Sequence, residues 1–338
     1  MPRDERLRAL KTLENLRSSR ILVYVLGDRR GLETKIASDS LPFCLTHLLR
    51  MGRQRRIDLF LYGAGGITMA GYGLVNLIRE FCDSFGVIIP FKAHSTATLV
   101  ALGADEIVMT KMGQLSPIDP SVVSPLGPQI QIPGQPGAAQ PVPVNVEDVR
   151  SYIDIARKEL GVKDEDLLVR VLERLSQTVH PLVLGSVNRI REQTSFLATT
   201  LLKQHMDNPE KITNIVEIIT RGRFSHDYLI SRKEAKDVLG LNVVEDEKIE
   251  NETFRLYREC DGILQLSTPY NAEAVLGAND TVTADFNRAL IEADDLTHVF
   301  RTRKKIDRVT LTPPQVPTST PGFFERILSE QWLEDNNI

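Results

Sequence analysis

Two short segments of the sequence carry the residue types that acyl transfer needs. Gly65 and Gly66 follow the apolar run at residues 57–62, and Ser95 follows the apolar run at residues 87–91. Such runs predict buried parallel strands, and the carboxyl ends of neighbouring parallel strands meet at one edge of a sheet. A glycine turn exposes backbone N–H groups, and a serine between a strand and a helix N-terminus is a candidate nucleophile. Together they predict a hydroxyl that faces donors able to hold an oxyanion.

The elements that would position these residues follow one another as in an α/β fold. Residues 38–50 and 74–85 have helical apolar spacing. Predicted strands lie at residues 20–26, 57–62, 87–91 and 106–110. Because these strands are continuous apolar runs, they predict a parallel sheet with helices on its faces.

The ends of the chain differ from this pattern. Residues 1–19 are predicted to form an amphipathic N-terminal arm. Residues 246–338 are predicted to be a C-terminal extension with short strands, among them 263–266 and 297–301. The sequence does not indicate what this extension does.

The middle of the chain contains an uncharged segment. Residues 120–146 are rich in Pro, Gln and Gly, which predicts an inserted loop or semi-rigid excursion. Helical spacing follows, with Asn145 as an expected N-cap, and Ser231 with Glu234 forms an expected capping box.

Composition limits the classes of protein that fit. Of 338 residues, 42% are hydrophobic and 25% charged, as in soluble globular proteins. The net charge of −4 gives no basic field for nucleic acid, and no apolar run is long enough for a membrane span. The N-terminus is charged and has no apolar signal region, and three dispersed cysteines favour a reducing compartment. We therefore expect a cytoplasmic protein.

No cofactor or metal is expected. The sequence has no His-Glu-x-x-His motif and no cysteine pair with metal-ligand spacing. The glycine turn at residues 63–66 lacks the Lys-Ser/Thr of a phosphate-binding loop and the spacing of a dinucleotide fingerprint.

Several motifs, taken in order, resemble a known family. Residues 59–71 resemble the strand–diglycine–helix segment of Clp and signal-peptide-peptidase-A proteases, and residues 93–107 resemble their nucleophile segment. Leu-Ser-Pro-Ile-Asp-Pro at 115–120, His-Pro-Leu-Val-Leu-Gly at 180–185 and the segment 222–241 follow. The chain is thus similar to the serine dehydrogenase proteinase family of the Clp/crotonase superfamily.

This resemblance implies a Clp/crotonase-like domain at residues 20–245 that contains the 120–146 insertion. It also implies a serine peptidase that acts on peptides or proteins as a homo-oligomer. Ser95 would be the nucleophile, and the backbone N–H groups of Gly66 and Thr96, beside Gly65, would form the oxyanion hole.

The general base stays open. Clp proteases place a histidine about two dozen residues after the serine, where this chain has Asp119 and no histidine. Signal-peptide-peptidase-A enzymes use a lysine, whose position corresponds to residues 160–180 here. His180 is favoured because an imidazole titrates near neutrality. Lys163 is the second candidate, and Asp119 could be a base or orient one.

Two other functions are compatible with the same residues. A crotonase-type enzyme would use the oxyanion hole to stabilise an acyl-CoA enolate, with Asp119 as its base. A Clp-like scaffold without a base would bind a protein partner through residues 120–146 or the C-terminal tail.

Overall fold

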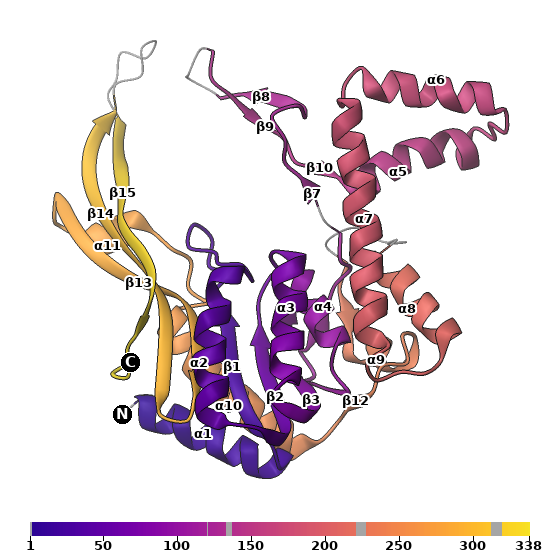
Figure 1. The fold of residues 1–338 in the computed structure, drawn as a ribbon. Helices are drawn as coiled ribbons and strands as arrows, with labels where there is room; N and C mark the ends of the chain where they lie inside the picture. Colours follow the sequence, from indigo (N-terminus) through magenta and orange to yellow (C-terminus); the bar gives the residue numbers. More distant parts are fainter. Residues whose placement is uncertain (1, 120, 133–136, 221–227, 312–319) are drawn as a thin grey trace. The chain divides into compact units, whose positions relative to one another are not determined.

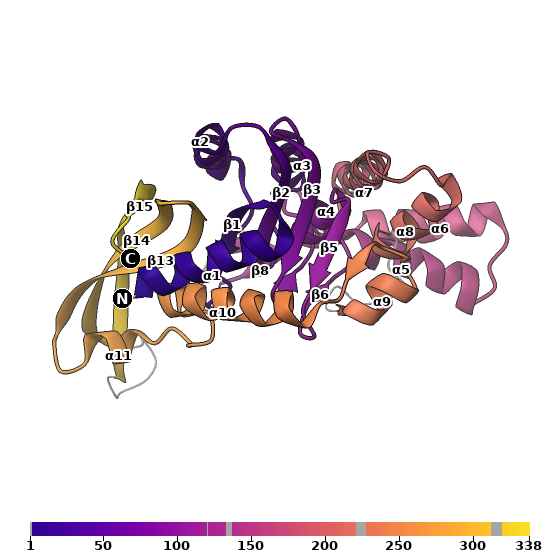
Figure 2. The same ribbon diagram turned by 90° about the horizontal axis from the view of Figure 1, so that it is seen from below.

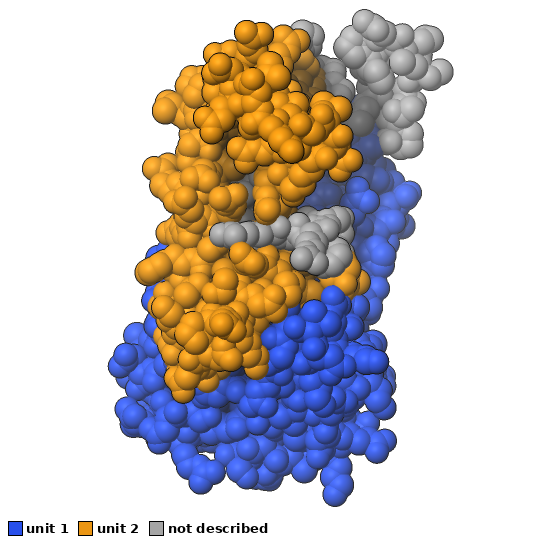
Figure 3. Space-filling view, turned by 90° about the vertical axis from the view of Figure 1, so that its right-hand side faces the viewer, with its two compact units in different colours: residues 1–115, 231–338 blue, residues 116–230 orange. Residues whose placement is uncertain are grey.

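The computed structural model describes residues 2–119, 121–132, 137–220, 228–311 and 320–338 (Figure 1). The chain divides into two compact units, which Figure 3 distinguishes by colour. Unit 1 consists of Met1–Leu115 and Ser231–Ile338, and unit 2 of Ser116–Ile230. These boundaries differ from the expected arm (1–19), domain (20–245) and extension (246–338). Both chain ends pack against the predicted sheet and belong to unit 1.

Unit 1 is built on an eight-stranded sheet of order β12-β5-β3-β2-β1-β13-β14-β15. Its parallel part contains β1 (Arg20–Leu26), β2 (Gln54–Tyr62), β3 (Cys82–Ile89), β5 (Glu106–Met109) and β12 (Val243–Val244). The four strands expected from apolar runs are all present. The predicted α/β class with a parallel sheet is therefore confirmed.

The helices cover both faces of this parallel part (Figure 2). The strands β1, β2, β3 and β5 are neighbours in chain order, so right-handed connections place the intervening helices on one face. These helices are α2 (Leu41–Met51), which follows a 3₁₀ turn (Ser38–Ser40), α3 (Thr68–Arg79) and α4 (Thr96–Leu102). The other face is covered by α1 (Pro2–Arg17) and α10 (Glu247–Leu264), which lie side by side.

One predicted helix extends too far. The expected helix at residues 74–85 ends at Arg79, and Phe85 is a fully buried residue of β3. Only a short turn joins α3 to β3. The last apolar residues of the helix and the first apolar residues of the strand therefore happen to follow a helical spacing in the sequence.

The N-terminal segment forms a helix that contributes to the core of unit 1. Arg6 of α1 is fully buried and donates to both carboxylate oxygens of Glu292, at 2.6 and 2.8 Å, and to the carbonyl of Ile338 at 2.9 Å. Arg17, near the other end of α1, donates to the buried carboxylate of Asp58 in β2 at 2.9 Å. Buried ion pairs therefore fix both ends of this helix to the sheet.

The C-terminal strands are long, and the expectation of short strands is wrong. The strands β13 (Thr281–Ala293), β14 (Leu296–Leu311) and β15 (Thr320–Glu334) form an antiparallel extension of the sheet, with β13 paired to β1. Residues 263–266, expected as a strand, include the end of α10, which α11 (Ala272–Leu276) follows. Charged residues recur on both faces of these strands, which weakens the apolar alternation that marks a strand.

Short strands and one capping box complete unit 1. The strands are β4 (Lys92–Ala93) and β6 (Gln114–Leu115), with β11 (Ile230–Ser231) at the unit boundary, and the capping box begins the short helix α9 (Arg232–Asp237). The Ser231 hydroxyl accepts a hydrogen bond from the Glu234 N–H at 3.3 Å, as the capping box predicts.

Unit 2 contains the uncharged segment and a group of helices. Residues 121–145 include two antiparallel pairs, β7 (Ser121–Val122) with β10 (Val144–Asn145) and β8 (Gln129–Gln131) with β9 (Ala139–Pro141). The helices are α5 (Val146–Asp154), a π-helical turn (Ile155–Glu159), α6 (Glu165–Ser176), α7 (Pro181–Leu202) and α8 (Pro209–Thr220). Asn145 precedes α5, but its side chain forms no capping bond, so that expectation is wrong.

Two other expectations concern cysteines and membranes. Cys44, Cys82 and Cys260 are all free and buried, as expected for dispersed cysteines. Within the described ranges, no helix combines the length and the apolar character needed to cross a bilayer.

A pair of buried histidines joins α2 to the C-terminal strands. His47 Nε2 lies 3.0 Å from His298 Nδ1, and the side chain of His298 also contacts Phe43, with ring centroids 5.0 Å apart. Burial lowers the pKa of His47 to about 3, helped by His298 and Arg50. Burial also lowers the pKa of His298, although Glu334 opposes this effect.

These shifts predict loss of stability in mild acid. Both folded-state pKa values lie below the ordinary unfolded value of about 6.5, so stability is complete above that pH. It declines as pH falls from about 6.5 towards 3, because the unfolded chain binds protons that the folded chain excludes. For His47 alone the free energy of unfolding should fall by about 2 kcal/mol between pH 6.5 and 5.

Denaturant unfolding at pH 7.5 and pH 5 checks this prediction. His47→Leu should reduce the difference between the two pH values by about 2 kcal/mol. Leu49→Ala, which changes an exposed and non-titratable side chain of the same helix α2, is the control and should leave the difference unchanged. An equal pH dependence in wild type and His47→Leu would contradict the assignment.

Candidate active site

The glycine segment after β2 lies directly beside the segment that carries Ser95. The Gly63 N–H donates to the carbonyl of Lys92 at 3.0 Å, and the carbonyl of Gly63 accepts from the His94 N–H at 3.0 Å. These bonds form a parallel bridge between Gly63 and Ala93. The glycine turn that follows β2 and the turn that contains Ser95 therefore begin side by side.

A second segment holds the diglycine from its other side. The Ile36 N–H donates to the carbonyl of Gly65, and the Ile67 N–H donates to the carbonyl of Ile36, both at 2.8 Å. A Cβ atom added to Gly66 would lie 2.2 Å from the Ile36 oxygen. Only glycine allows this approach, so the segment is clamped in one conformation between Ile36 and the Ser95 segment.

Ser95 adopts an unusual backbone conformation. It lies between β4 and α4 with φ 51° and ψ −115°, outside the regions that L-residues normally occupy. Sharp strand-to-helix turns of this kind expose a nucleophile in hydrolases, and such strain is maintained only where the surroundings impose it. The residue is partly exposed, whereas Thr96 behind it is buried.

Gly65 faces the Ser95 side chain. A Cβ atom built on Gly65 would lie 2.8 Å from Ser95 Cβ and 3.2 Å from Ser95 Oγ. The φ of Gly65 is 113°, which a residue with a side chain rarely adopts. The serine hydroxyl is therefore neither enclosed in the core nor turned away from the diglycine.

The backbone groups of Gly66 face away from Ile36. The groups of Gly65 and Ile67 that flank Gly66 point to Ile36, so the N–H and carbonyl of Gly66 point the opposite way. The Thr96 hydroxyl bonds that carbonyl at 2.7 Å. No acceptor within the described chain takes the N–H of Gly66 or Thr96. The oxyanion hole of Gly66 and Thr96 stays a prediction.

An ion pair beside the site was not predicted. Lys92 Nζ donates to Asp28 Oδ2 at 2.6 Å, and the Tyr62 hydroxyl donates to Asp28 Oδ1 at 2.7 Å. Burial, and then the Asp28 charge, raise the pKa of Tyr62. The network joins the carboxyl end of β1 to β2 and to the strand that precedes Ser95. An aspartate two residues after the first predicted strand was the available signal.

His180 lies in unit 2, where it caps a helix. It is exposed, and its Nδ1 accepts from the Leu182 N–H at 3.2 Å at the start of α7. A neutral imidazole in this arrangement carries its proton on Nε2. Acting as a base through Nε2 would require this imidazole to give up its capping bond.

The other two candidate residues also lie in unit 2. Lys163 is exposed in the loop before α6, so unit 2 itself does not provide the desolvation that a lysine base needs. Asp119 is buried. Burial raises the pKa of Glu147, and the charge of Asp119 adds to this rise while Arg150 and Arg191 oppose it. The two carboxyl groups are thus electrostatically coupled. Residues 221–227 lie outside the described residues, and they contain the beginning of the 222–241 motif.

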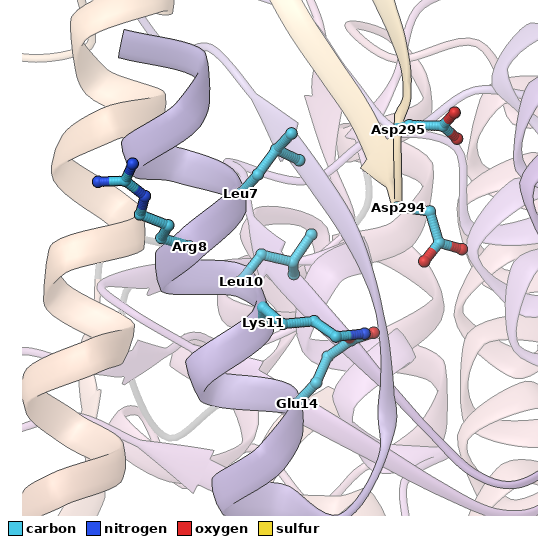
Figure 4. Close-up of a pocket in the computed structure, with 7 residues that line it drawn as sticks. All are labelled: Leu7, Arg8, Leu10, Lys11, Glu14, Asp294 and Asp295. Atoms are coloured by element: carbon cyan, nitrogen blue, oxygen red, sulfur yellow. The ribbon is translucent and has the colours of Figure 1, made fainter. Parts of the chain in front are cut away.

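Unit 1 has a pocket away from the Ser95 site, between α1 and the turn that joins β13 to β14 (Figure 4). Its volume is about 430 Å³, and its lining contains no residue of the Ser95 site. Asp295 pairs with Arg50 at 2.8 Å, and Lys11 pairs with Glu14 at 3.1 Å. Because these charged groups already have partners in the chain, the pocket gives no indication of a ligand.

The comparison with known families concerns the part of the chain that contains both the glycine turn and the serine turn. Residues 44–158, which contain the diglycine and Ser95, match the family described as ClpP-like SDH-type serine proteinase. The expected resemblance to the serine dehydrogenase proteinase family is therefore confirmed.

Two curated relatives come from Methanocaldococcus jannaschii, and both are described as uncharacterized. MJ0137 is 26% identical over 257 residues, which cover 74% of this chain and 77% of that protein. MJ1495 is 27% identical over 247 residues, which cover 71% of each.

Three solved structures are also similar. A mutant of the 1510-N membrane-bound stomatin-specific protease has 16% identity and a TM-score of 0.37, covering 65% of this chain and 79% of that one. The ClpP catalytic domain from Plasmodium falciparum has 11% identity and a TM-score of 0.32, covering 63% and 82%. A mutant ClpP1 from Listeria monocytogenes has 14% identity and a TM-score of 0.33, covering 71% and 99%.

The geometry predicts that Gly65→Ala disrupts the site. The new methyl group would collide with Ser95 Cβ, and the backbone would be strained at φ 113°. Because strain of this kind costs about 1–3 kcal/mol, reaction of Ser95 with a fluorophosphonate should slow by about tenfold or more. The labelling rate measures this effect.

Gly262→Ala is the matched control. A Cβ atom there meets nothing within 4 Å, and the residue lies inside α10. Labelling should be unchanged, and the helix should be stabilised by about 0.5–1 kcal/mol. Equal labelling rates of the two variants would show that Gly65 does not adjoin the reactive hydroxyl.

Proposed function

We propose that the protein is a serine peptidase whose nucleophile is Ser95. The observation that carries this proposal is the left-handed backbone of Ser95, which presents its hydroxyl at Gly65. The family match over residues 44–158 supports the same reaction class. Ile67 and Met69, which lie just after Gly66 in the sequence, are exposed and offer an apolar surface for a substrate side chain.

The reaction proceeds by acyl transfer. The Ser95 oxygen attacks the carbonyl carbon of a peptide bond while a base takes the hydroxyl proton. The N–H groups of Gly66 and Thr96 hold the oxyanion, and the protonated base then gives its proton to the leaving amine. Water attacks the resulting ester by the reverse sequence and releases Ser95.

The base is drawn from the residues expected at the sequence level. His180 is the first candidate, Lys163 the second, and Asp119 would orient the base or act in its place. His180 would use Nε2 after its capping bond to Leu182 breaks. The enzyme is further proposed to act as a homo-oligomer, and its three free cysteines are compatible with a reducing compartment.

Replacement of Ser95 tests the nucleophile. Ser95→Ala should abolish labelling by a fluorophosphonate and hydrolysis of a fluorogenic peptide, because no other hydroxyl occupies the strained turn. Ser176→Ala removes a hydroxyl on α6 that bonds only its own helix, and labelling should persist. Undiminished labelling of Ser95→Ala would exclude Ser95 from the mechanism.

A pair of substitutions at position 180 separates a base from a helix cap. Asparagine is a good N-cap, whereas alanine is not, and neither residue has an imidazole. If His180 is the base, both variants should lose at least about a hundredfold in kcat. The limb of the pH–rate profile that reports the base should disappear from any residual activity. Full activity of His180→Asn would assign the base to another group, and Lys163→Gln is then the next variant to measure.

A further inference from the structure

Unit 2 contains a cleft between α5, α6 and α7 with a volume of about 530 Å³. This volume falls in the range of sites that hold small organic ligands or a few peptide residues. Apolar side chains from all three helices line it: Val149, Ile153, Leu172, Leu184 and Val187. The π-helical turn at Ile155–Glu159 ends α5 beside it, and such turns frequently occur at functional sites.

The rim of the cleft carries more positive than negative charge. Arg150 is within 3.8 Å of Glu147 and 3.7 Å of Asp154, so its charge is compensated. Arg157 and Arg191 also line the cleft. No carboxylate of the described residues lies within salt-bridge distance of either, although the charge of Arg191 also acts on the Glu147 carboxyl at longer range. Two guanidinium groups above an apolar floor are suited to a ligand with an apolar body and a carboxylate.

The helix on one side of the cleft lacks a partner for its apolar face. None of the residues of α6 is buried, and Leu172 is 47% exposed although it faces the cleft. Occupation of the cleft would cover this apolar surface.

We propose that this cleft binds the apolar C-terminal end of a peptide, with its free α-carboxylate on Arg157 and Arg191. A peptide is favoured over a fatty acid because the rim also contains acceptor oxygens, namely the Asn188 side-chain oxygen and the Asp154 carboxylate, whose Oδ2 also accepts from Lys158 at 2.7 Å. Peptide N–H groups can donate to these oxygens, whereas a fatty acid has no donor for them. The site goes beyond the proposed hydrolysis and does not depend on it.

Fluorescence anisotropy on the full chain with Ser95→Ala tests this proposal without cleavage of the ligand. The probe is an N-terminally fluorescein-labelled peptide that ends in Ala-Leu-Val-Leu with a free carboxylate. It should bind saturably, and the same peptide with a C-terminal amide should bind about tenfold more weakly or worse, because charge-assisted bonds are lost.

Substitutions locate the binding site. Arg191→Gln should weaken the acid peptide about tenfold and leave the amide peptide unaffected. Leu172→Ala should weaken both peptides alike, because it removes part of the floor. The matched controls are Arg189→Gln and Val169→Ala, which change exposed residues of α7 and α6 outside the lining. Both controls should bind as the parent does.

Four outcomes would overturn the proposal. They are absence of saturable binding at millimolar peptide, equal affinity for acid and amide, an unchanged affinity in Arg191→Gln, and tighter binding of dodecanoate than of the peptide. The last result would assign the cleft to fatty acids. Because the Ser95→Ala chain is used throughout, none of these results bears on whether Ser95 is a nucleophile.

Discussion

The left-handed backbone at Ser95 is the constraint on which the rest of the site depends. A residue with a side chain adopts φ 51° only if its surroundings compensate the strain. The bridge between Gly63 and Ala93 fixes the segment before Ser95, and the bond from Thr96 Oγ1 to the Gly66 carbonyl fixes the segment after it. Because residue 65 is a glycine, no side chain fills the space into which the Ser95 side chain projects. The reactive geometry is thus a property of backbone hydrogen bonds in unit 1, and the hydroxyl is positioned before any ligand arrives.

The sheet can hold that turn rigidly because both of its faces are covered. Sequential strand order places α2, α3 and α4 on one face, so the other face needs helices from elsewhere in the chain. Helix α1, which precedes the first strand, and helix α10, which follows the last parallel strand, supply them. Buried ion pairs, Arg6 with Glu292 and Arg17 with Asp58, fix the register of α1 on the sheet. Pairs of this kind add little net stability, but loss of one partner leaves a buried charge that costs about 3–5 kcal/mol. Their role is to allow one placement of the helix and to exclude others.

Sequence reasoning succeeded where the signal was local and failed where it depended on distant partners. The strands β1 and β2 and the turn at Gly65 were recognisable because apolar runs and glycines mark them directly. The length of β14 was missed because residues such as Lys304 and Thr302 are polar yet buried, which only pairing with β13 and β15 explains. Ile36 was missed for the same reason, since its role rests on backbone bonds that no residue type announces. The base could not be assigned because the candidate residues, among them His180, follow Ser95 by a long and partly helical segment.

The two units also differ in how their helices are stabilised. Helix α4 is buried along its whole length, so packing alone can maintain it. Helix α6 has twelve residues and buries none, and an isolated helix of that length is marginal in water. The Asp164 carboxylate supports its first turn, where it caps two N–H groups and contributes about 1 kcal/mol. An amphipathic helix with so little support lies at the low end of the stability range within a fold, where ligand-binding elements are commonly found. A ligand that covers the apolar face of α6 would therefore stabilise the helix as it binds, and affinity and order in this part of unit 2 would rise together.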